Sequence, residues 1–286
     1  MALIVFSHAN SFPAGTYRTL LDALAAGGHT VHALERFGHD PRYPVSNNWP
    51  HLVEQLADFA GPAIASHPSP AFLVGHSLGG FLSLMCAAQY PRLGGRGVDG
   101  VVLLDSPLLG GWRASVVALA KHIQLVGVVS PARLSRKRRT RWPDLHTARE
   151  HFRHKRPFRH WDEQALEDYL VYGTRDDLDR FGQPCRRLVF DRSVETRIYN
   201  TLPHNLERLL RKHPLRCPVG FIGGTLSLES RQVGLGLTRK LAGGAETGRV
   251  RFIEGTHLFP MERPRETAEA ITTMLERMQN HHPPAA

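Results

Sequence analysis

The chain has 286 residues, of which 42% are hydrophobic and 22% charged, and its formal net charge is +10. This length and composition are ordinary for a soluble globular protein, and they allow either one large α/β domain or a domain with an insertion. No apolar run approaches the ~20 residues that a membrane span needs, which argues against a transmembrane helix.

The N-terminus and the cysteines bear on location and cofactors. The apolar run Leu3-Ile4-Val5-Phe6 is too short for a signal peptide and has no basic segment before it. Three scattered cysteines, Cys86, Cys185 and Cys217, show neither a disulfide framework nor metal-binding spacing. These features favour a cytoplasmic location, and neither a metal nor another cofactor is expected.

The first hundred residues alternate between continuously apolar runs and amphipathic segments. The apolar runs predict buried strands, and the amphipathic segments predict helices with one apolar face. In chain order the pattern predicts a strand at residues 2–6, a helix from 16 to about 26, a strand at 30–34, a helix at 49–59, a strand at 72–74, a helix at 81–89 and a strand at 98–104. This alternation is typical of an α/β fold whose mostly parallel central sheet is flanked by helices on both faces.

The alternation stops at Pro107 and returns about a hundred residues later. Residues 108–212 show helical patterns at 116–123, 164–172 and 195–210, the last of them broken by Pro203. They show little strand pattern apart from a possible short strand at 188–190. We therefore interpret them as a helical cap insertion over the carboxyl end of the sheet. Strands are expected again at 218–222 and 250–253, and helices at 232–241 and 267–278. The predicted core therefore comprises residues 1–107 and 213–280, with a disordered tail at 281–286.

Much of the positive charge lies between Arg133 and Arg159, inside the predicted insertion. The favoured interpretation is a solvated helix face. A basic surface module for nucleic acid or membrane is the alternative, but no aromatic stacking motif accompanies the charge, so a nucleic-acid partner is not expected.

The strongest functional signal is the segment Gly75-His76-Ser77-Leu78-Gly79-Gly80, which lies between a predicted strand and a predicted helix. A serine raised on so tight a turn needs a strained backbone and neighbours without side chains two residues away on each side. Gly75 and Gly79 meet that need, and the helix that follows points its amides at the place where negative charge develops in acyl transfer. Ser77 is therefore the candidate nucleophile.

A serine nucleophile needs a base, and the base needs an acid to orient it. His257 is the best candidate base, because it follows the last predicted strand in the turn Gly255-Thr256-His257. Two acids are possible. Asp105 ends the strand that follows the nucleophile helix, and Glu229 lies on the loop after the penultimate strand.

Together these segments resemble the α/β-hydrolase fold family. Gly75 to Gly80 looks like its nucleophile elbow, Gly255-Thr256-His257 like its histidine loop, and Ser7-His8-Ala9-Asn10 like its oxyanion loop, with Ala9 in place of the usual glycine. The resemblance implies an oxyanion hole formed by the backbone N–H groups of Leu78 and Asn10. It also implies that the usual leading hairpin is missing.

The resemblance also bears on the choice of acid. Most members of the family carry an Asp after the penultimate strand, where this chain has Leu228, whereas some members carry it at the position of Asp105. Asp105 is therefore favoured over Glu229.

Further residues are candidates for lining a substrate pocket. His8 and His76 lie beside the predicted oxyanion loop and elbow, although His76 is favoured as a packing and hydrogen-bonding residue under the turn. Trp112 offers an aromatic wall. Arg197 offers a partner for a substrate carboxylate, although a structural ion pair is favoured for it.

The predicted function is a serine hydrolase that cleaves an ester or thioester of a small molecule through an acyl-enzyme. Hydrolysis of a C–C bond and acyl transfer use the same residues and stay open, as does the oligomeric state. The alternative is a catalytically silent protein of the same fold that senses a ligand or binds another protein.

Overall fold

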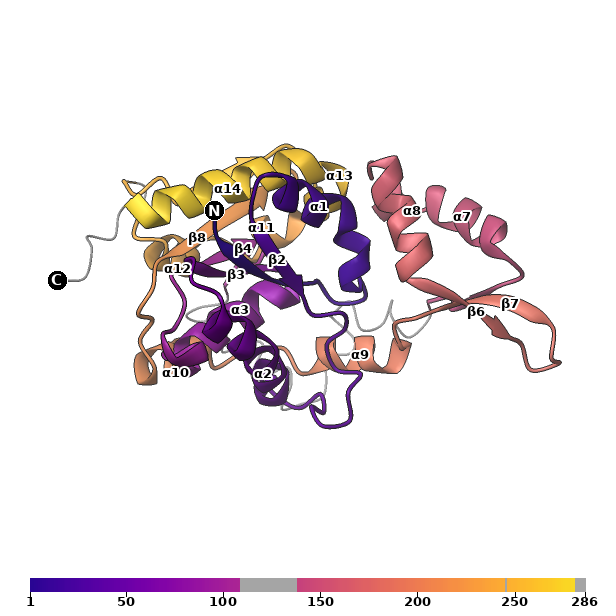
Figure 1. The fold of residues 1–286 in the computed structure, drawn as a ribbon. Helices are drawn as coiled ribbons and strands as arrows, with labels where there is room; N and C mark the ends of the chain where they lie inside the picture. Colours follow the sequence, from indigo (N-terminus) through magenta and orange to yellow (C-terminus); the bar gives the residue numbers. More distant parts are fainter. Residues whose placement is uncertain (109–137, 245, 281–286) are drawn as a thin grey trace.

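The computed structural model describes residues 1–108, 138–244 and 246–280 (Figure 1). The strands of the described chain are β1 (Leu3–Ser7), β2 (Thr30–Ala33), β3 (Ala71–His76), β4 (Gly100–Leu104), β5 (Arg141–Trp142), β6 (Thr174–Leu178), β7 (Pro184–Leu188), β8 (Val219–Gly224) and β9 (Val250–Ile253). Its α-helices are α1 (Arg18–Ala26), α2 (Pro50–Ser66), α3 (Leu78–Gln89), α7 (Leu145–Arg153), α8 (Glu163–Tyr172), α9 (Arg192–Asn200), α10 (Leu206–Lys212), α11 (Leu228–Val233), α12 (Gly236–Leu241), α13 (Phe259–Glu262) and α14 (Pro264–Asn280).

The centre of the molecule is a six-stranded sheet with the order β2-β1-β3-β4-β8-β9. Every neighbouring pair in it is parallel. Strands β1, β3, β4 and β8 are buried along their whole length, whereas the edge strands β2 and β9 are partly exposed. The prediction of an α/β fold with a mostly parallel central sheet is therefore confirmed.

Helices cover both faces of this sheet. Figure 1 shows α1 and α14 on one side and α2, α3 and α10 on the other. Because side chains alternate along a strand, β1 sends Ile4 and Phe6 into one hydrophobic core and Leu3 and Val5 into the other. The continuously apolar strands are thus explained by burial on both faces.

The helices expected at 49–59 and 232–241 differ from those observed. Helix α2 continues past Phe59 to Ser66 with Pro62 inside it, and its last turns stay anchored through the buried Ile64. The helix expected at 232–241 is instead two short helices, α11 and α12, separated at Gly234, whose φ of 77° is left-handed. A left-handed residue cannot continue an α-helix, so the chain breaks there.

Between β4 and β8 the described part of the chain contains four helices, α7 to α10, and also a three-stranded antiparallel sheet with the order β5-β7-β6. The expectation of an almost purely helical insertion is therefore wrong for this part. The missed strands read Thr-Arg-Asp-Asp-Leu and Pro-Cys-Arg-Arg-Leu, which lack the alternation of apolar and polar residues that marks a strand. Opposite charges pair across them instead, as between Arg186 and Asp176 at 2.9 Å.

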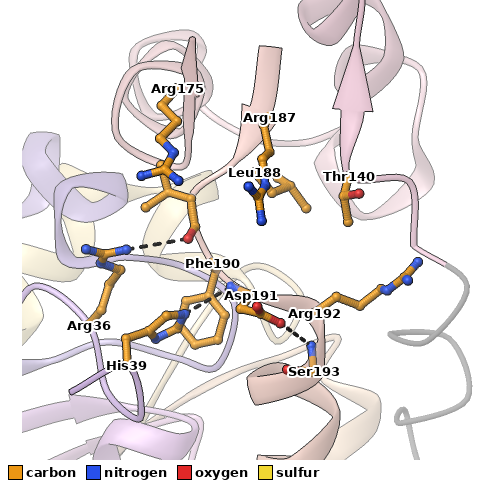
Figure 2. A pocket seen from close by; sticks show the side chains of 11 residues that line it. Arg36, His39, Thr140, Arg175, Arg187, Leu188, Phe190, Asp191, Arg192 and Ser193 are labelled. Atoms are coloured by element: carbon orange, nitrogen blue, oxygen red, sulfur yellow. Dashed lines mark hydrogen bonds between the residues drawn. The ribbon is translucent and has the colours of Figure 1, made fainter. Parts of the chain in front are cut away.

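Arg175 and Arg187 project from this hairpin toward the loop of the core that carries Arg36 and His39 (Figure 2). The helix expected at 116–123 and the tail at 281–286 lie outside the described residues.

No helix in the described ranges is long and apolar enough to cross a membrane. The three cysteines are free, and Cys86 is buried in the core on α3.

Candidate active site

Ser77 occupies a sharp turn between β3 and α3. Its φ of 52° and ψ of −114° lie outside the regions that residues with a side chain prefer. A Cβ atom on Gly75 would lie 2.2 Å from the carbonyl oxygen of Gly79, and one on Gly79 would lie 2.0 Å from the carbonyl oxygen of Ser7. The turn therefore requires both glycines, as the sequence predicted.

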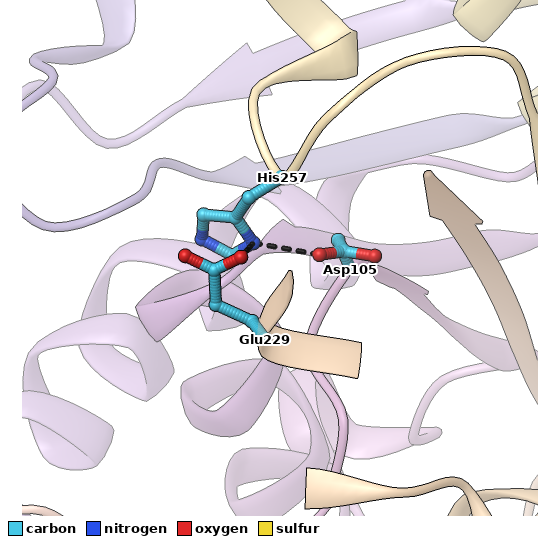
Figure 3. A group of neighbouring side chains, drawn as sticks. All are labelled: Asp105, Glu229 and His257. Atoms are coloured by element: carbon cyan, nitrogen blue, oxygen red, sulfur yellow. Dashed lines mark hydrogen bonds and ion pairs between the residues drawn. The ribbon is translucent and has the colours of Figure 1, made fainter. Parts of the chain in front are cut away.

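His257 connects this serine to a carboxylate. Its Nε2 lies 3.0 Å from Ser77 Oγ, and its Nδ1 lies 2.7 Å from Asp105 Oδ2 (Figure 3 shows the second contact). Because a carboxylate only accepts hydrogen bonds, Nδ1 donates to Asp105, which leaves Nε2 free to accept the Ser77 proton. The loop that carries His257 is held in turn by Glu262, whose Oε2 accepts the N–H of Thr256 at 2.9 Å.

The Asp105 carboxylate is fully buried at the end of β4 and accepts hydrogen bonds from several directions. Besides His257, its donors are the Gly224 N–H at 3.0 Å, the Ser230 hydroxyl at 2.9 Å and the Ser227 hydroxyl. Burial alone raises the pKa of this carboxyl, but the hydrogen bonds and the charge of His257 outweigh burial and hold the pKa below its usual value. Asp105 is therefore held as a carboxylate.

Glu229 is the second acid near the histidine, and its side chain is half exposed. One of its carboxylate oxygens lies 4.0 Å from His257 Nδ1, beyond hydrogen-bond distance (Figure 3). Asp105 and Glu229 act on the imidazole together: burial lowers the pKa of His257, but the hydrogen bond to Asp105 and the charges of Asp105 and Glu229 raise it above its usual value.

These three side chains are also of the types that bind metals, and their nearest ligand atoms lie within 4.8 Å of one another. The Nδ1 of His257 is nevertheless a donor to Asp105, and the Asp105 oxygens already accept the hydrogen bonds of Ser227, Ser230 and Gly224. The donor set therefore fits a hydrogen-bonded acid–base pair better than a metal centre.

A buried hydrogen-bond chain runs beneath the serine. The Ala9 N–H donates to the Tyr17 hydroxyl at 3.1 Å, and this hydroxyl lies 2.7 Å from Nδ1 of His76. The Nε2 of His76 lies 2.8 Å from the carbonyl oxygen of His257 and donates to it, since a carbonyl only accepts. Burial and the neighbouring charge of His257 lower the pKa of His76 to about 3, so His76 stays neutral. The chain thus connects the loop after β1 to the histidine loop.

The two residues expected at an oxyanion hole lie at the ends of elements that flank the serine. Leu78 is the first residue of α3, and Asn10 follows β1. No hydrogen-bond acceptor for the backbone N–H of either residue is found in the part of the chain that the structure describes. The Asn10 side-chain amide is used elsewhere, because it donates to the carbonyl oxygen of Glu195 in α9 at 3.1 Å.

The residues predicted to line a substrate pocket differ in their burial and in their contacts. His8 is fully buried; its Nδ1 donates to the Ala9 carbonyl at 2.7 Å and its Nε2 accepts the N–H of Phe37 at 3.0 Å. Its ring nitrogens, like those of His76, are therefore used within the fold. Arg197 is exposed on α9, and Trp112 lies outside the described residues.

Sequence reasoning missed Tyr17, Ser227 and Ser230. Of these, only Ser227 carried a local signal, since a serine that precedes a helix commonly caps it; its hydroxyl accepts the Ser230 N–H at 3.1 Å.

Comparison with known proteins places the chain in a family. Residues 4–270 match the model of the alpha/beta hydrolase family. A monoacylglycerol lipase of Mycolicibacterium smegmatis is 29% identical over 133 residues, which cover 45% of this chain and 46% of the lipase. The chain therefore matches about half the length of this curated relative.

Solved structures resemble nearly the whole chain. E-2-(acetamidomethylene)succinate hydrolase has a TM-score of 0.69 at 20% identity, covering 96% of this chain and 92% of that one. The thioesterase domain from the curacin biosynthetic pathway has a TM-score of 0.66 at 18% identity, covering 95% and 91%. At these identities the likeness shows a shared fold. Because the family model matches nearly the whole sequence, the chain belongs to the alpha/beta hydrolase family.

Proposed function

We propose that the protein is a serine hydrolase that cleaves an ester or thioester of a small molecule through an acyl-enzyme. The observation that carries the proposal is the position of His257, with one ring nitrogen 3.0 Å from Ser77 Oγ and the other 2.7 Å from Asp105 Oδ2. A serine hydroxyl becomes a good nucleophile only when a neighbouring base takes its proton, and this geometry supplies that base.

The acylation step follows from the placement of the three side chains. Ser77 Oγ attacks the substrate carbonyl carbon while His257 Nε2 takes the hydroxyl proton. Asp105 holds Nδ1–H in place and stabilises the imidazolium that forms. The imidazolium then gives its proton to the leaving alcohol or thiol. Water repeats the sequence on the acyl-enzyme, and Ser77 is released with its proton restored.

The negative charge on the carbonyl oxygen needs hydrogen-bond donors. In the proposal these are the backbone N–H groups of Leu78 and Asn10, which have no acceptor among the described residues. One donor of this kind lowers the barrier by about 3 kcal/mol. The amide of Leu78 also lies at the positive end of α3, which adds a favourable field.

An ester or thioester substrate is supported by the relatives, which include a monoacylglycerol lipase and a thioesterase domain. Phe12, two residues after Asn10, packs its ring against Phe158, Trp161 and Tyr169 of the core at centroid distances of 6.4, 5.6 and 5.7 Å. In the proposal, the region of α7 and α8 acts as part of the cap that covers this end of the sheet.

Covalent labelling tests the proposal and separates it from a catalytically silent, ligand-binding protein. A fluorophosphonate probe is expected to label the wild type and Ser66→Ala, in which an exposed serine is replaced, but not Ser77→Ala. A panel of short p-nitrophenyl esters and acyl thioesters then identifies the preferred leaving group. Absence of both labelling and turnover in the folded wild type would contradict the proposal and favour the silent protein.

A further inference from the structure

A polar pocket lies between the core and the hairpin of β6 and β7 (Figure 2). Its volume is about 420 Å³. Four arginines from separate parts of the chain line it: Arg36 from the loop after β2, Arg175 from β6, Arg187 from β7 and Arg192 from the start of α9. Neither Ser77, Asp105 nor His257 belongs to its lining.

The positive charge of this pocket is poorly balanced. The one carboxylate in its lining, Asp191, caps α9 by accepting the Ser193 N–H at 2.6 Å. His39 adds no charge, since its Nδ1 lies 2.9 Å from the Phe37 carbonyl and its Nε2 accepts the Asp191 N–H at 2.9 Å. The lining therefore carries four guanidinium groups against one carboxylate.

The strand register brings like charges together. Arg175 on β6 is directly opposite Arg187 on β7, and Arg187 is directly opposite Arg141 on β5. Like charges in directly opposed positions destabilise a sheet. Asp177 is shared between two of these arginines, at 3.1 Å from Arg141 and 3.3 Å from Arg187. The row of three arginines is therefore only partly neutralised within the protein.

Most N–H groups of the pocket arginines remain available to a ligand. Arg36 donates to the Val189 carbonyl at 3.5 Å, and Arg192 donates to the Arg138 carbonyl at 3.2 Å. Arg187 donates to the Asp177 carboxylate at 3.3 Å, and no acceptor for the Arg175 guanidinium is found within the described ranges. Each guanidinium offers five N–H donors in a fork that matches phosphate oxygens.

We propose that this pocket binds a small molecule through a phosphate or diphosphate group, with Arg175 and Arg187 on one side and Arg36 and Arg192 on the other. Phosphate is favoured because it offers several charged acceptor oxygens to guanidinium donors that four separate parts of the chain contribute to the lining. A small ligand rather than a polymer is favoured because the arginines line a single pocket of about 420 Å³. The site does not depend on the hydrolase activity, so it can be tested separately from it.

Calorimetric titration at low ionic strength tests the site, with inorganic diphosphate and ADP as the probes. The wild type is expected to bind at least one of them, and the affinity is expected to fall as salt is added. The double variant Arg175→Gln/Arg187→Gln is expected to raise the Kd at least about tenfold, since it removes two charge-assisted donors. The matched control Arg211→Gln/Arg265→Gln removes the same charge from exposed positions on α10 and α14 and is expected to bind like the wild type.

Arg192→Gln gives a second test in case the hairpin variant does not fold, since Arg192 is exposed at the start of α9. It too is expected to weaken binding. Tighter binding of ADP than of diphosphate would assign the site to an organic phosphate, and equal binding would assign it to the free anion. The proposal is overturned if neither probe binds, if the control weakens binding as much as the pocket variants, or if only an oligonucleotide or anionic vesicles bind.

Discussion

Two residues of the candidate site hold backbone conformations that residues with side chains avoid. The φ angles are 52° at Ser77 and 38° at Asp105. Such conformations cost about 1–3 kcal/mol each and persist only where the surroundings enforce them. Here the sheet enforces both, because the Ser77 N–H donates to the Leu104 carbonyl at 3.0 Å and the Asp105 N–H to the Ile222 carbonyl at 2.8 Å. The candidate nucleophile and the candidate acid are thus fixed by neighbouring strands.

The two acids near His257 are expected to contribute very differently to turnover. Asp105→Asn is expected to reduce kcat/KM at least about 10³-fold, because it removes the negative charge and replaces the acceptor of Nδ1–H with an amide N–H₂ group, which favours the wrong imidazole tautomer. Glu229→Gln is expected to reduce it less than about tenfold, since Glu229 acts only through its partly screened charge. Steady-state kinetics on the preferred ester measure both. Near-normal turnover of Asp105→Asn with loss in Glu229→Gln would reverse the assignment.

Glu229 is expected to influence the pH dependence of kcat/KM instead. His257 accepts a proton only when neutral, so kcat/KM falls as the pH drops through the pKa of His257. That pKa is raised, so the acid limb of the wild-type profile is expected above the ordinary histidine value of 6.5. Because the Glu229 charge contributes to raising the pKa, Glu229→Gln is expected to shift the acid limb to lower pH. An unchanged limb would show that this charge does not reach the imidazole.

At the scale of elements, the contact between the elbow and β1 holds the site together. Gly79 lies against the Ser7 carbonyl, and the Ala9–Tyr17–His76 chain continues from the same loop to His257. The loop after β1, the elbow and the histidine loop are therefore coupled through backbone packing and buried hydrogen bonds.

The elbow is expected to tolerate no side chain at Gly79. Gly79→Ala would place a Cβ 2.0 Å from a backbone oxygen, so the free energy of unfolding is expected to fall by about 1–3 kcal/mol or more. Gly236→Ala is the matched control, because a Cβ there meets nothing within 4 Å, and it is expected to change stability by no more than about 1 kcal/mol. Urea denaturation measures both, and equal effects would contradict the packing argument.

The buried hydrogen-bond chain from Ala9 through Tyr17 to His76 is expected to position the loops of the candidate site rather than bind substrate. Tyr17→Phe removes the hydroxyl between Ala9 and His76, so kcat is expected to fall about tenfold with KM little changed. Tyr90→Phe, at a tyrosine that is 38% exposed, is the control and is expected to leave both constants unchanged. A rise in KM alone would instead indicate a role in substrate binding.

At the scale of the molecule, the buried ion pair of Arg138 and Glu195 joins distant parts of the segment between β4 and β8. Through Glu195 it also connects this segment to the candidate site. The Arg138 guanidinium lies 3.2 Å from a Glu195 carboxylate oxygen and donates to the Tyr169 hydroxyl at 2.6 Å. The backbone carbonyl of Glu195 also accepts the side chain of Asn10. Helices α8 and α9 are thus joined at the loop that supplies a proposed oxyanion donor.

Breaking this pair is expected to destabilise the protein. Arg138→Met leaves the carboxylate of Glu195 buried, with only 7% of its side chain exposed, and is expected to cost about 3–5 kcal/mol. Adding Glu195→Gln removes the uncompensated charge and is expected to recover part of the loss. Arg42→Ala breaks a largely exposed pair with Asp40 and is expected to cost less than about 1 kcal/mol. An Arg138→Met variant as stable as Arg42→Ala would contradict this view.

Local patterns were sufficient to predict the central α/β fold and the elbow. Burial of a strand on both faces requires a continuous apolar run, and a tight turn at a serine requires glycines at fixed spacing. Both features can therefore be recognised from residues that are close in the sequence. The hairpin of β6 and β7 escaped prediction because charge pairs, rather than an apolar face, hold its strands together.

The sequence by itself determined the order of the strands in the central α/β core, the position of Ser77 and the placing of His257 after the last strand of the central sheet. Only the tertiary structure decided which carboxylate meets the imidazole, because Asp105 and His257 are 152 residues apart and Glu229 is a chemically equal alternative. The strand order places β4 beside β8, so the loop after β8 surrounds Asp105 with donors and leaves Glu229 half exposed. The arginine pocket also depends on the tertiary structure, since strand register and helix placement bring its charges together from four separate parts of the chain.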